Sequence, residues 1–455
     1  MRRPLLFHIG LPKTGTTSIQ LFLAENREAL QALGIYYPHT PGRVSHGLLA
    51  ASVVTDVRRL WGPGHRVWQG LAPDLRLNLF RAEWAKEMDA LPDWVTRCVM
   101  SSEVTSVMLR RREDVLRFAG VLRQHFDPVH IIVYLRRQDM QSASAYSQWL
   151  RNGQLLPAAL PAEGQEDQWN FDYAALLDMY AAAFGEAAIV PRIFEPESLK
   201  NGDAVADFLH AADIKLDIPE ATARRRNPSL AMAGQALLLR AGTRIAQSCP
   251  DASWRTGATW MRLSESISAA LPGAGWKPSR DEARAFVARY AASNEAVRAR
   301  FLPQRAALFS DDFTMFPEAD SQAKPAQVAD AAVRALLHLL EEGRERETRG
   351  VMNEFRLART LGRRQTMRRL LQRLLELSPE NPVINAWAAE RALDDGEYER
   401  AAIYAAAALR ADPESRHALL LQSAVHRRLK SPPLHRRKRA FGRARLKAEA
   451  QAPAT

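Results

Sequence analysis

Near its start the chain reads Leu5-Leu6-Phe7-His8-Ile9-Gly10-Leu11-Pro12-Lys13-Thr14-Gly15-Thr16-Thr17-Ser18-Ile19-Gln20. The apolar run before Gly10 predicts a buried β-strand, and the hydroxyl residues after Gly15 predict the start of a helix. A short loop with a single lysine connects the two. Backbone N–H groups at a helix N-terminus have no partner within the helix, and the helix dipole favours negative charge there. The stretch therefore predicts a loop that binds a phosphate-like anion.

The position of Lys13 distinguishes this loop from that of proteins that split ATP or GTP. Their motif is G-x-x-x-x-G-K-[ST], in which the lysine follows the second glycine and the hydroxyl binds Mg²⁺. Gly10 and Gly15 keep the glycine spacing, but Lys13 lies inside the loop. A later apolar strand, residues 129–135, ends in two arginines and not in an acidic metal ligand. Cations and hydroxyls without metal ligands favour transfer of a sulfuryl group over a γ-phosphate, so no metal site is expected.

The loop resembles the 5′-phosphosulfate loop of sulfotransferases that use 3′-phosphoadenosine 5′-phosphosulfate (PAPS). The resemblance rests on the residues Pro12-Lys13-Thr14-Gly15-Thr16-Thr17. It implies that PAPS is the co-substrate and that Lys13 is catalytic, close to the bridging oxygen that leaves with the nucleotide. The residues implied to bind the 5′-phosphate are Lys13, Thr14, Gly15, Thr16, Thr17 and Ser18.

A second motif of the same family lies about 120 residues later, where the chain reads Ile131-Ile132-Val133-Tyr134-Leu135-Arg136-Arg137-Gln138-Asp139. In the family, an arginine at a strand end and a serine eight residues later bind the 3′-phosphate, which here implies Arg136 and Ser144. A guanidinium fork and a serine hydroxyl suit a phosphate monoester. The family often has Arg-Asn-Pro where this chain has Arg136-Arg137-Gln138. The resemblance covers roughly residues 4 to 315.

Two residues are candidates for the base that activates the acceptor. Glu103 follows the apolar strand 96–100, at a position comparable to that of the catalytic histidine of cytosolic family members. The alternative role for Glu103 is to cap the following helix or to pair with an arginine. His46, which follows the first helix, is the rival base. We favour Glu103 because a base must first be within reach of the proton.

Strands and helices alternate in the first half of the chain, which predicts an α/β fold with a parallel sheet and right-handed crossovers, like that of P-loop proteins. Both anion-binding motifs then lie at the carboxyl ends of strands, where ligands bind in such sheets. The predicted strands are residues 5–9, 35–37, 96–100, 129–135 and 188–193. The predicted helices are residues 17–33, 78–90, 111–125, 141–151 and 171–184.

The remainder of the chain is predicted to be helical and to end in a basic tail. We expect a sulfotransferase-like domain over residues 1–315, with a helical part from about 224 that begins with three arginines, Arg224 to Arg226. An all-α region over residues 325–430 resembles tetratricopeptide repeats, because Gly362 and Gly396, and also Pro379 and Pro413, are 34 residues apart. Such helix pairs suggest a protein partner, with a simple helical cap as the alternative.

The charge distribution argues against a nucleic-acid-binding protein. The net charge of the chain is +12. The segment from Arg427 to Lys447 contains ten lysines and arginines and no acidic residue, so the rest of the chain is nearly neutral. The tail over residues 431–455 is expected to be disordered, with contact to an anionic membrane surface, RNA or an acidic polysaccharide as minor alternatives. Two cysteines, no long apolar run and a strand that starts by residue 4, which leaves no room for a signal peptide, favour a soluble enzyme of the cytoplasm. Animal Golgi members of the family usually have an N-terminal membrane anchor, so its absence and the Ala- and Arg-rich composition favour a bacterial enzyme.

The predicted activity is therefore sulfuryl transfer from PAPS to a hydroxyl or amine, with a carbohydrate or glycolipid as the expected acceptor. A divergent nucleotide-dependent kinase is the second enzymatic hypothesis, and it would require Mg²⁺. A non-catalytic scaffold for the helical repeats is the third. The lysine, threonines, arginine and serine of the two motifs speak against a scaffold, which does not need all of them.

Overall fold

The computed structural model describes residues 2–60, 68, 70–163, 171–216, 230–249, 257–319 and 323–430. The chain divides into two compact units, Met1–Ala335 and Leu336–Thr455. This division falls inside helix α15 (Pro325–Thr360), beyond the boundary expected between residues 315 and 325. Within the described ranges, none of the helices combines the length and the apolarity needed to cross a lipid bilayer.

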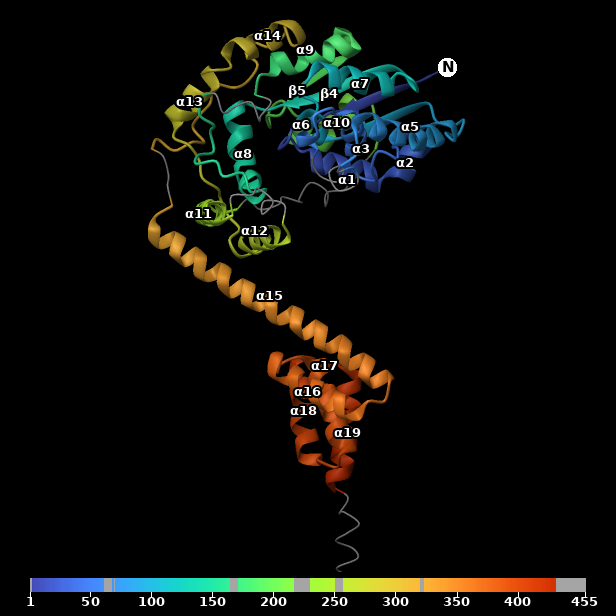
Figure 1. The fold of residues 1–455 in the computed structure, drawn as a ribbon, viewed down its shortest axis with the longest axis vertical. Helices are drawn as coiled ribbons and strands as arrows, with labels where there is room; N and C mark the ends of the chain where they lie inside the picture. Colours follow the sequence, from blue (N-terminus) through green and yellow to red (C-terminus); the bar gives the residue numbers. More distant parts are fainter. Residues whose placement is uncertain are drawn as a thin grey trace, which may run out of the picture. The chain divides into compact units, whose positions relative to one another are not determined.

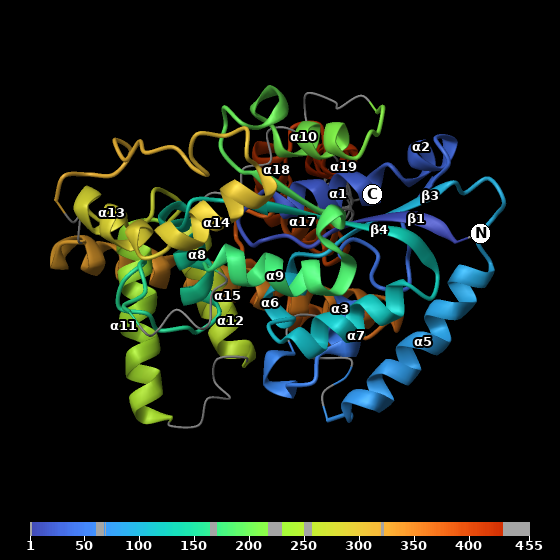
Figure 2. The same ribbon diagram turned by 90° about the horizontal axis from the view of Figure 1, so that it is seen from above.

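The first unit is built on a parallel sheet in the strand order β2-β3-β1-β4-β5, which confirms the predicted α/β class (Figures 1 and 2). β1 is central and pairs with both β3 and β4. Each strand coincides with a predicted one, with ends that differ by up to three residues. The strands are β1 (Arg3–His8), β2 (Ile35–Tyr36), β3 (Arg97–Ser101), β4 (Phe126–Leu135) and β5 (Ile189–Ile193).

Apolar side chains on the two faces of the sheet belong to two separate cores. Leu5 and Phe7 of β1 contribute to one core, together with alternate residues of β3 and β4. Val99, Ile132 and Tyr134 contribute to the other. Because successive side chains of a strand point to opposite faces, continuous apolar strands such as these indicate a sheet that is covered on both sides.

Helices form both covering layers, as Figure 2 shows for α1 and α10 on one side and α5 and α7 on the other. The predicted helix 17–33 is wrong in one respect, because it is divided at Asn26. The Asn26 side-chain amide donates to the Phe22 carbonyl, a local bond that competes with helix continuation. The helices are α1 (Thr16–Glu25), α2 (Arg27–Ala32), α3 (Gly47–Val53), α5 (Pro73–Asp89), α6 (Glu103–Met108), α7 (Arg112–Leu122), α8 (Gln138–Arg151), α9 (Tyr173–Phe184) and α10 (Ala204–Ala211).

A helical extension completes the first unit and packs on α8 through a third apolar cluster that includes Trp149, Trp260 and Phe286. It corresponds to the helical part predicted from about residue 224. Residues 217–229, which include the three arginines at its predicted start, lie outside the described residues. The helices are α11 (Met232–Ser248), α12 (Ala258–Ala270), α13 (Arg280–Ala288) and α14 (Ala291–Phe301).

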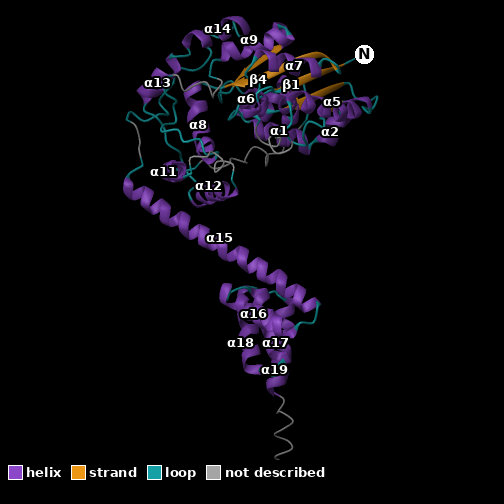
Figure 3. Ribbon diagram, viewed as in Figure 1, coloured by secondary structure: helices purple, strands orange, loops and turns teal. Residues whose placement is uncertain are grey.

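The described part of the second unit is entirely helical (Figure 3). Gly362 and Gly396 both have positive φ angles in the turns that follow α15 and α17, which explains their 34-residue spacing. Ala401, Ala405 and Ala408 are completely buried, so α18 approaches its neighbours closely. The predicted tail, residues 431–455, lies outside the described residues. The helices are α16 (Arg364–Leu377), α17 (Pro382–Asp394), α18 (Tyr398–Ala411) and α19 (Arg416–Lys430).

Candidate functional site

Three neighbouring strands of the sheet end at the candidate site. β3, β1 and β4 are adjacent and parallel, so their carboxyl ends lie along one edge. Glu103 follows β3, the glycine-bordered loop 10–15 follows β1, and Arg136 follows β4. The strand order therefore brings together residues that are about 30 to 120 positions apart in the sequence. The arrangement is the usual ligand-binding position of a parallel sheet.

The loop after β1 has a tight and strained backbone. Gly10, Lys13 and Gly15 all have positive φ angles, of 85°, 68° and 78°. A side chain on Gly10 would place its Cβ 2.6 Å from the Cα of Glu103, so a glycine is required for this close approach. A positive φ is unfavourable for lysine, and such strain often occurs at functional sites. The loop geometry thus fixes both the path of the backbone around the helix N-terminus and the position of Lys13.

A single cavity of about 910 Å³ is lined by both predicted anion-binding motifs. Arg136 also donates a hydrogen bond of 2.9 Å to the Lys13 carbonyl, which links the two motifs directly. Thr14 is buried inside the loop, where its hydroxyl donates to the Leu11 carbonyl, and it is absent from the cavity lining. The predicted site residues that do line the cavity are Lys13, Gly15, Thr16, Thr17, Ser18, Glu103, Arg136 and Ser144.

The cavity is rich in positive charge. Lys13, Arg136 and Arg151 all line it, and none of the three side chains forms an ion pair with a described residue. Burial lowers the pKa of Lys13, and the charges of Arg151 and Arg136 lower it further, whereas Glu103 opposes them. Burial also lowers the pKa of Arg136 and of Arg151. Such a concentration of desolvated cations is stabilised by a bound anion.

Glu103 and His46, the two predicted bases, are in very different surroundings. Glu103 lies in the first turn of α6 and accepts a hydrogen bond of 2.5 Å from the Thr16 hydroxyl. His46 is completely buried and does not line the cavity. Its Nδ1 accepts from the Ser101 N–H and its Nε2 lies 2.9 Å from the Pro38 carbonyl. Burial lowers the pKa of His46 to about 3. The geometry therefore places Glu103, and not His46, at the cavity.

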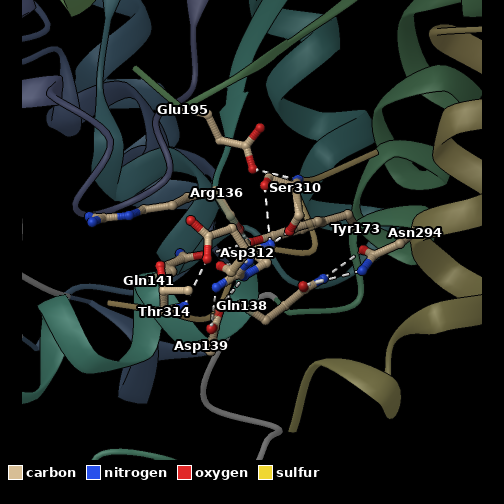
Figure 4. Close-up of polar contacts among 11 residues, drawn as sticks. Arg136, Gln138, Asp139, Gln141, Tyr173, Glu195, Asn294, Ser310, Asp312 and Thr314 are labelled. Carbon is tan, nitrogen blue, oxygen red and sulfur yellow. Dashed lines mark hydrogen bonds and ion pairs between the residues drawn. The ribbon is translucent and has the colours of Figure 1, made fainter. Parts of the chain in front are cut away.

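The second arginine of the pair has a structural position. Arg137 is buried and forms two hydrogen bonds with the Asp139 carboxylate, at 2.9 and 3.0 Å. It also donates to the carbonyls of Ser310 and Asp312. Figure 4 shows that the Arg136 side chain extends away from this cluster. The two neighbouring arginines therefore have different surroundings. Arg136 lines the cavity, and Arg137 binds the segment at Ser310 and Asp312.

Gln138, the next residue, also holds the start of α8 against distant parts of the chain. Its side-chain amide donates to the Asn294 side chain at 2.7 Å (Figure 4). It also donates to the Phe171 carbonyl at 3.2 Å. The Tyr173 hydroxyl donates to the Arg136 carbonyl, so the backbone of the cavity-facing arginine is anchored from α9. These bonds hold the turn between β4 and α8.

The sequence interpretation missed part of the cavity, namely Arg151 and helix α12. Arg151 is seven residues after Ser144 on α8, and the residues Ser144, Ser147, Gln148 and Arg151 form a polar stripe at helical spacing. That stripe was the signal available in the sequence. α12 contributes Met261, Ser264, Glu265 and Ser268. Its apolar residues Trp260, Leu263 and Ile267 have helical spacing, but nothing in them indicates which helix they pack against.

Among the described residues, no group of three or more His, Cys, Asp or Glu side chains is arranged so that it could hold a metal ion. Arg224 to Arg226, at the start of the predicted helical part, lie outside the described residues, so the structure does not place them at the site.

Comparisons with known proteins identify only distant or partial similarities. No family model matches the chain. A protein of Archaeoglobus fulgidus, described as an uncharacterized protein, is 31% identical over 144 residues, which are 31% of this chain and 37% of that protein. The chain therefore matches little more than a third of the length of this relative. The crystal structure of a sulfotransferase from Alicyclobacillus acidocaldarius aligns with 67% of this chain and 99% of its own, at 16% identity and a TM-score of 0.33.

Proposed function

We propose that this protein transfers a sulfuryl group from PAPS to a hydroxyl group of an acceptor, for which a carbohydrate or glycolipid is the expected class. One observation carries the proposal: the loop with Lys13, the pair Arg136 and Ser144, and Glu103 line the same cavity. Each group was predicted for a separate part of one reaction. A cavity that contains all of them at the carboxyl edge of the sheet supports their joint action.

The residues of the cavity fit the anionic groups of PAPS. The N-terminus of α1 offers backbone N–H groups and the hydroxyls of Thr17 and Ser18 for the 5′-phosphate, while the Thr16 hydroxyl donates to Glu103. Arg136 and Ser144 offer a guanidinium and a hydroxyl for the 3′-phosphate. The cations of the cavity would be stabilised by a nucleotide with an anionic group at each end, whose adenine and ribose would span the space between the two ends.

PAPS supplies an activated sulfuryl group, so the protein has to position the acceptor, remove its proton and stabilise the leaving oxygen. In the proposed reaction a bond forms between the acceptor oxygen and sulfur, and the bond from sulfur to the bridging phosphate oxygen breaks. The Lys13 ammonium neutralises the charge on that bridging oxygen. Glu103 accepts the acceptor proton on its carboxylate, which the Thr16 hydroxyl orients through its hydrogen bond.

The experiment that tests the proposal is calorimetric titration with adenosine 3′,5′-bisphosphate (PAP) in the presence of EDTA, with AMP as the matched ligand that lacks the 3′-phosphate. We expect PAP to bind about 10 to 100 times more tightly than AMP, because Arg136 contributes charge-assisted hydrogen bonds. The preference should disappear in Arg136→Ala. Equal binding of PAP and AMP, or binding only with Mg²⁺, would contradict the proposal and favour the kinase alternative.

A further inference from the structure

The cavity has a second wall that the two anion-binding motifs do not provide. It is formed by the end of α8, with Arg151 and Asn152, and by α12, with Ser264, Glu265 and Ser268. In the proposed reaction the nucleotide is bound from the strand ends of β1 and β4. The second wall is therefore the part of the cavity that remains for the acceptor.

Arg151 is the notable residue of this wall. It lies seven residues after Ser144, on the same face of α8, and so about 10 Å farther along the helix. Its side chain is half-buried, and it forms no ion pair or hydrogen bond with a described residue. A desolvated guanidinium without a partner is unfavourable, and an anion stabilises it through charge-assisted hydrogen bonds. Lys13 and Arg136 already account for the two anionic ends of the nucleotide.

The position of Arg151 is fixed by its surroundings. The indole N–H of Trp260, a buried residue of α12, donates to the Arg151 carbonyl at 2.8 Å. Gly242 of α11 allows close packing here, because a Cβ on it would lie 2.4 Å from Leu155 and 3.1 Å from the Trp260 ring. The last turn of α8 and the wall of α12 are thus held against each other by a specific contact.

The polar groups of α12 suit a ligand with several hydroxyls. Ser264 and Ser268 are four residues apart, on one face of the helix. Their hydroxyls donate to the carbonyls of Met261 and Ser264, so their oxygen lone pairs remain to accept hydrogen bonds. Glu265 adds a carboxylate acceptor, and Met261 adds an exposed apolar side chain to the same wall. Acceptors for hydroxyl protons next to an apolar group are typical of a site for a small polar ligand.

We infer that Arg151 and α12 form an acceptor subsite that binds an acidic saccharide, with Arg151 paired to a carboxylate or sulfate group of the sugar and the α12 side chains bound to its hydroxyls. This inference rests on the proposed function, because it assigns the second wall to the acceptor of that reaction. It narrows the acceptor class from carbohydrates in general to those that carry a negative charge.

The test compares two hexasaccharides that differ only in charge: one with alternating uronic acids and the same molecule after reduction of its carboxyl groups to alcohols. Their binding is measured by calorimetry with the full chain saturated with PAP. We expect the acidic form to bind about 10 to 100 times more tightly to the wild type. Arg151→Gln should reduce this ratio to within about threefold, and Arg151→Lys should give an intermediate ratio, since lysine keeps the charge but loses the fork.

Two further variants control for general charge effects. Arg262→Gln removes the same charge from an exposed position of α12 outside the cavity, and should leave the ratio unchanged. Glu265→Gln removes a negative charge from the wall itself, and should raise the ratio, because repulsion of the acidic sugar is lost.

The outcomes separate the two proposals. If PAP does not bind the wild type, the proposed function fails and the acceptor subsite fails with it. If PAP binds but the wild type does not prefer the acidic sugar, or if Arg151→Gln keeps the preference, only the subsite is overturned. If the turnover of PAPS, measured separately, falls equally with both sugars in Arg151→Gln, Arg151 acts at the transferred group, which also contradicts the acceptor assignment.

Discussion

Lys13 is held in a conformation and an electrostatic environment that a surface lysine does not experience. Its backbone has a φ of 68°, and its carbonyl accepts the hydrogen bond from Arg136. Burial and two neighbouring arginines lower its pKa, while Glu103 alone opposes this effect. The ammonium therefore gains more from a bound anion than an exposed lysine would, because it replaces missing hydration with direct hydrogen bonds.

Replacement of this lysine should affect chemistry more than folding. We expect Lys13→Ala to lower the turnover of PAPS roughly 10²- to 10³-fold, since a cation aimed at the developing charge is lost. The rate is measured as PAP formed in the presence of the acidic hexasaccharide, and circular dichroism reports the fold. Lys13→Arg is the matched control that keeps the charge. An unchanged rate in Lys13→Ala would remove Lys13 from the reaction.

The lowered pKa of Lys13 also predicts a pH dependence of nucleotide binding. A lysine with a lowered pKa loses its proton below the ordinary value of 10.5, and the bound 5′-phosphate then loses its cation. PAP affinity should therefore fall as the pH rises toward that value, above pH 7.5, where the phosphates are already ionised. Calorimetry at several pH values measures the decline, and Lys13→Ala should remove it. A decline of the same size in the variant would assign it to another group.

His46 predicts a different pH effect, on stability. Its folded-state pKa of about 3 is below the ordinary 6.5, so the unfolded chain binds more protons between these values. The neutral His46 therefore contributes fully to the free energy of unfolding above pH 6.5. This contribution is lost as the pH falls toward 3, by about 1.4 kcal/mol per pH unit. Urea unfolding at pH 7 and 5 tests this. His46→Gln should be less stable at pH 7 but less sensitive to acid, and an equal slope would contradict the assignment.

The turn between β4 and α8 shows how an element boundary is held by contacts distant in sequence. Arg137 connects the first turn of α8 to the segment at Ser310 and Asp312, and its guanidinium lies 3.9 Å from the centroid of the Phe313 ring. Asp139 is completely buried and has Arg137 as its partner. A buried pair of this kind is destabilising when only one member is removed, because the other charge is left without compensation.

We therefore expect Arg137→Ala to lower the free energy of unfolding by about 3–5 kcal/mol. The double variant Arg137→Ala with Asp139→Ala should recover part of this loss, because no unpaired charge remains. Urea unfolding of the wild type, of Arg137→Ala, of Asp139→Ala and of the double variant forms a double-mutant cycle. Additive losses in the double variant would show that the two side chains do not act as a pair.

All residues that are proposed to bind the nucleotide belong to the first of the two compact units. Hydrogen exchange on the full chain with and without PAP can therefore locate the site. We expect increased protection of the amides in residues 10–18 and 136–151, and unchanged exchange in residues 364–430. Arg136→Ala serves as the control that should lose the protection. Protection confined to the helices of the second unit would contradict the proposed site.

Local patterns in the sequence were sufficient for much of this description. The apolar run before Gly10, the glycines around Lys13 and the strand before Arg136 predicted the elements and their order, because strand periodicity and helix starts depend on neighbouring residues. The same patterns did not locate the division of the first helix at Asn26, where a side chain competes with the backbone for hydrogen bonds.

Contacts between residues distant in the sequence determine which of the candidate residues reach the cavity. The order β3-β1-β4 places Glu103 and Arg136 on either side of the Lys13 loop, whereas His46, an equal candidate by residue type, is enclosed between Pro38 and Ser101. Arg151 and α12 line the same cavity because α12 packs on α8. The physical reason is that strand order and helix packing follow from burial of apolar faces across the whole chain, and no short stretch of sequence contains that information.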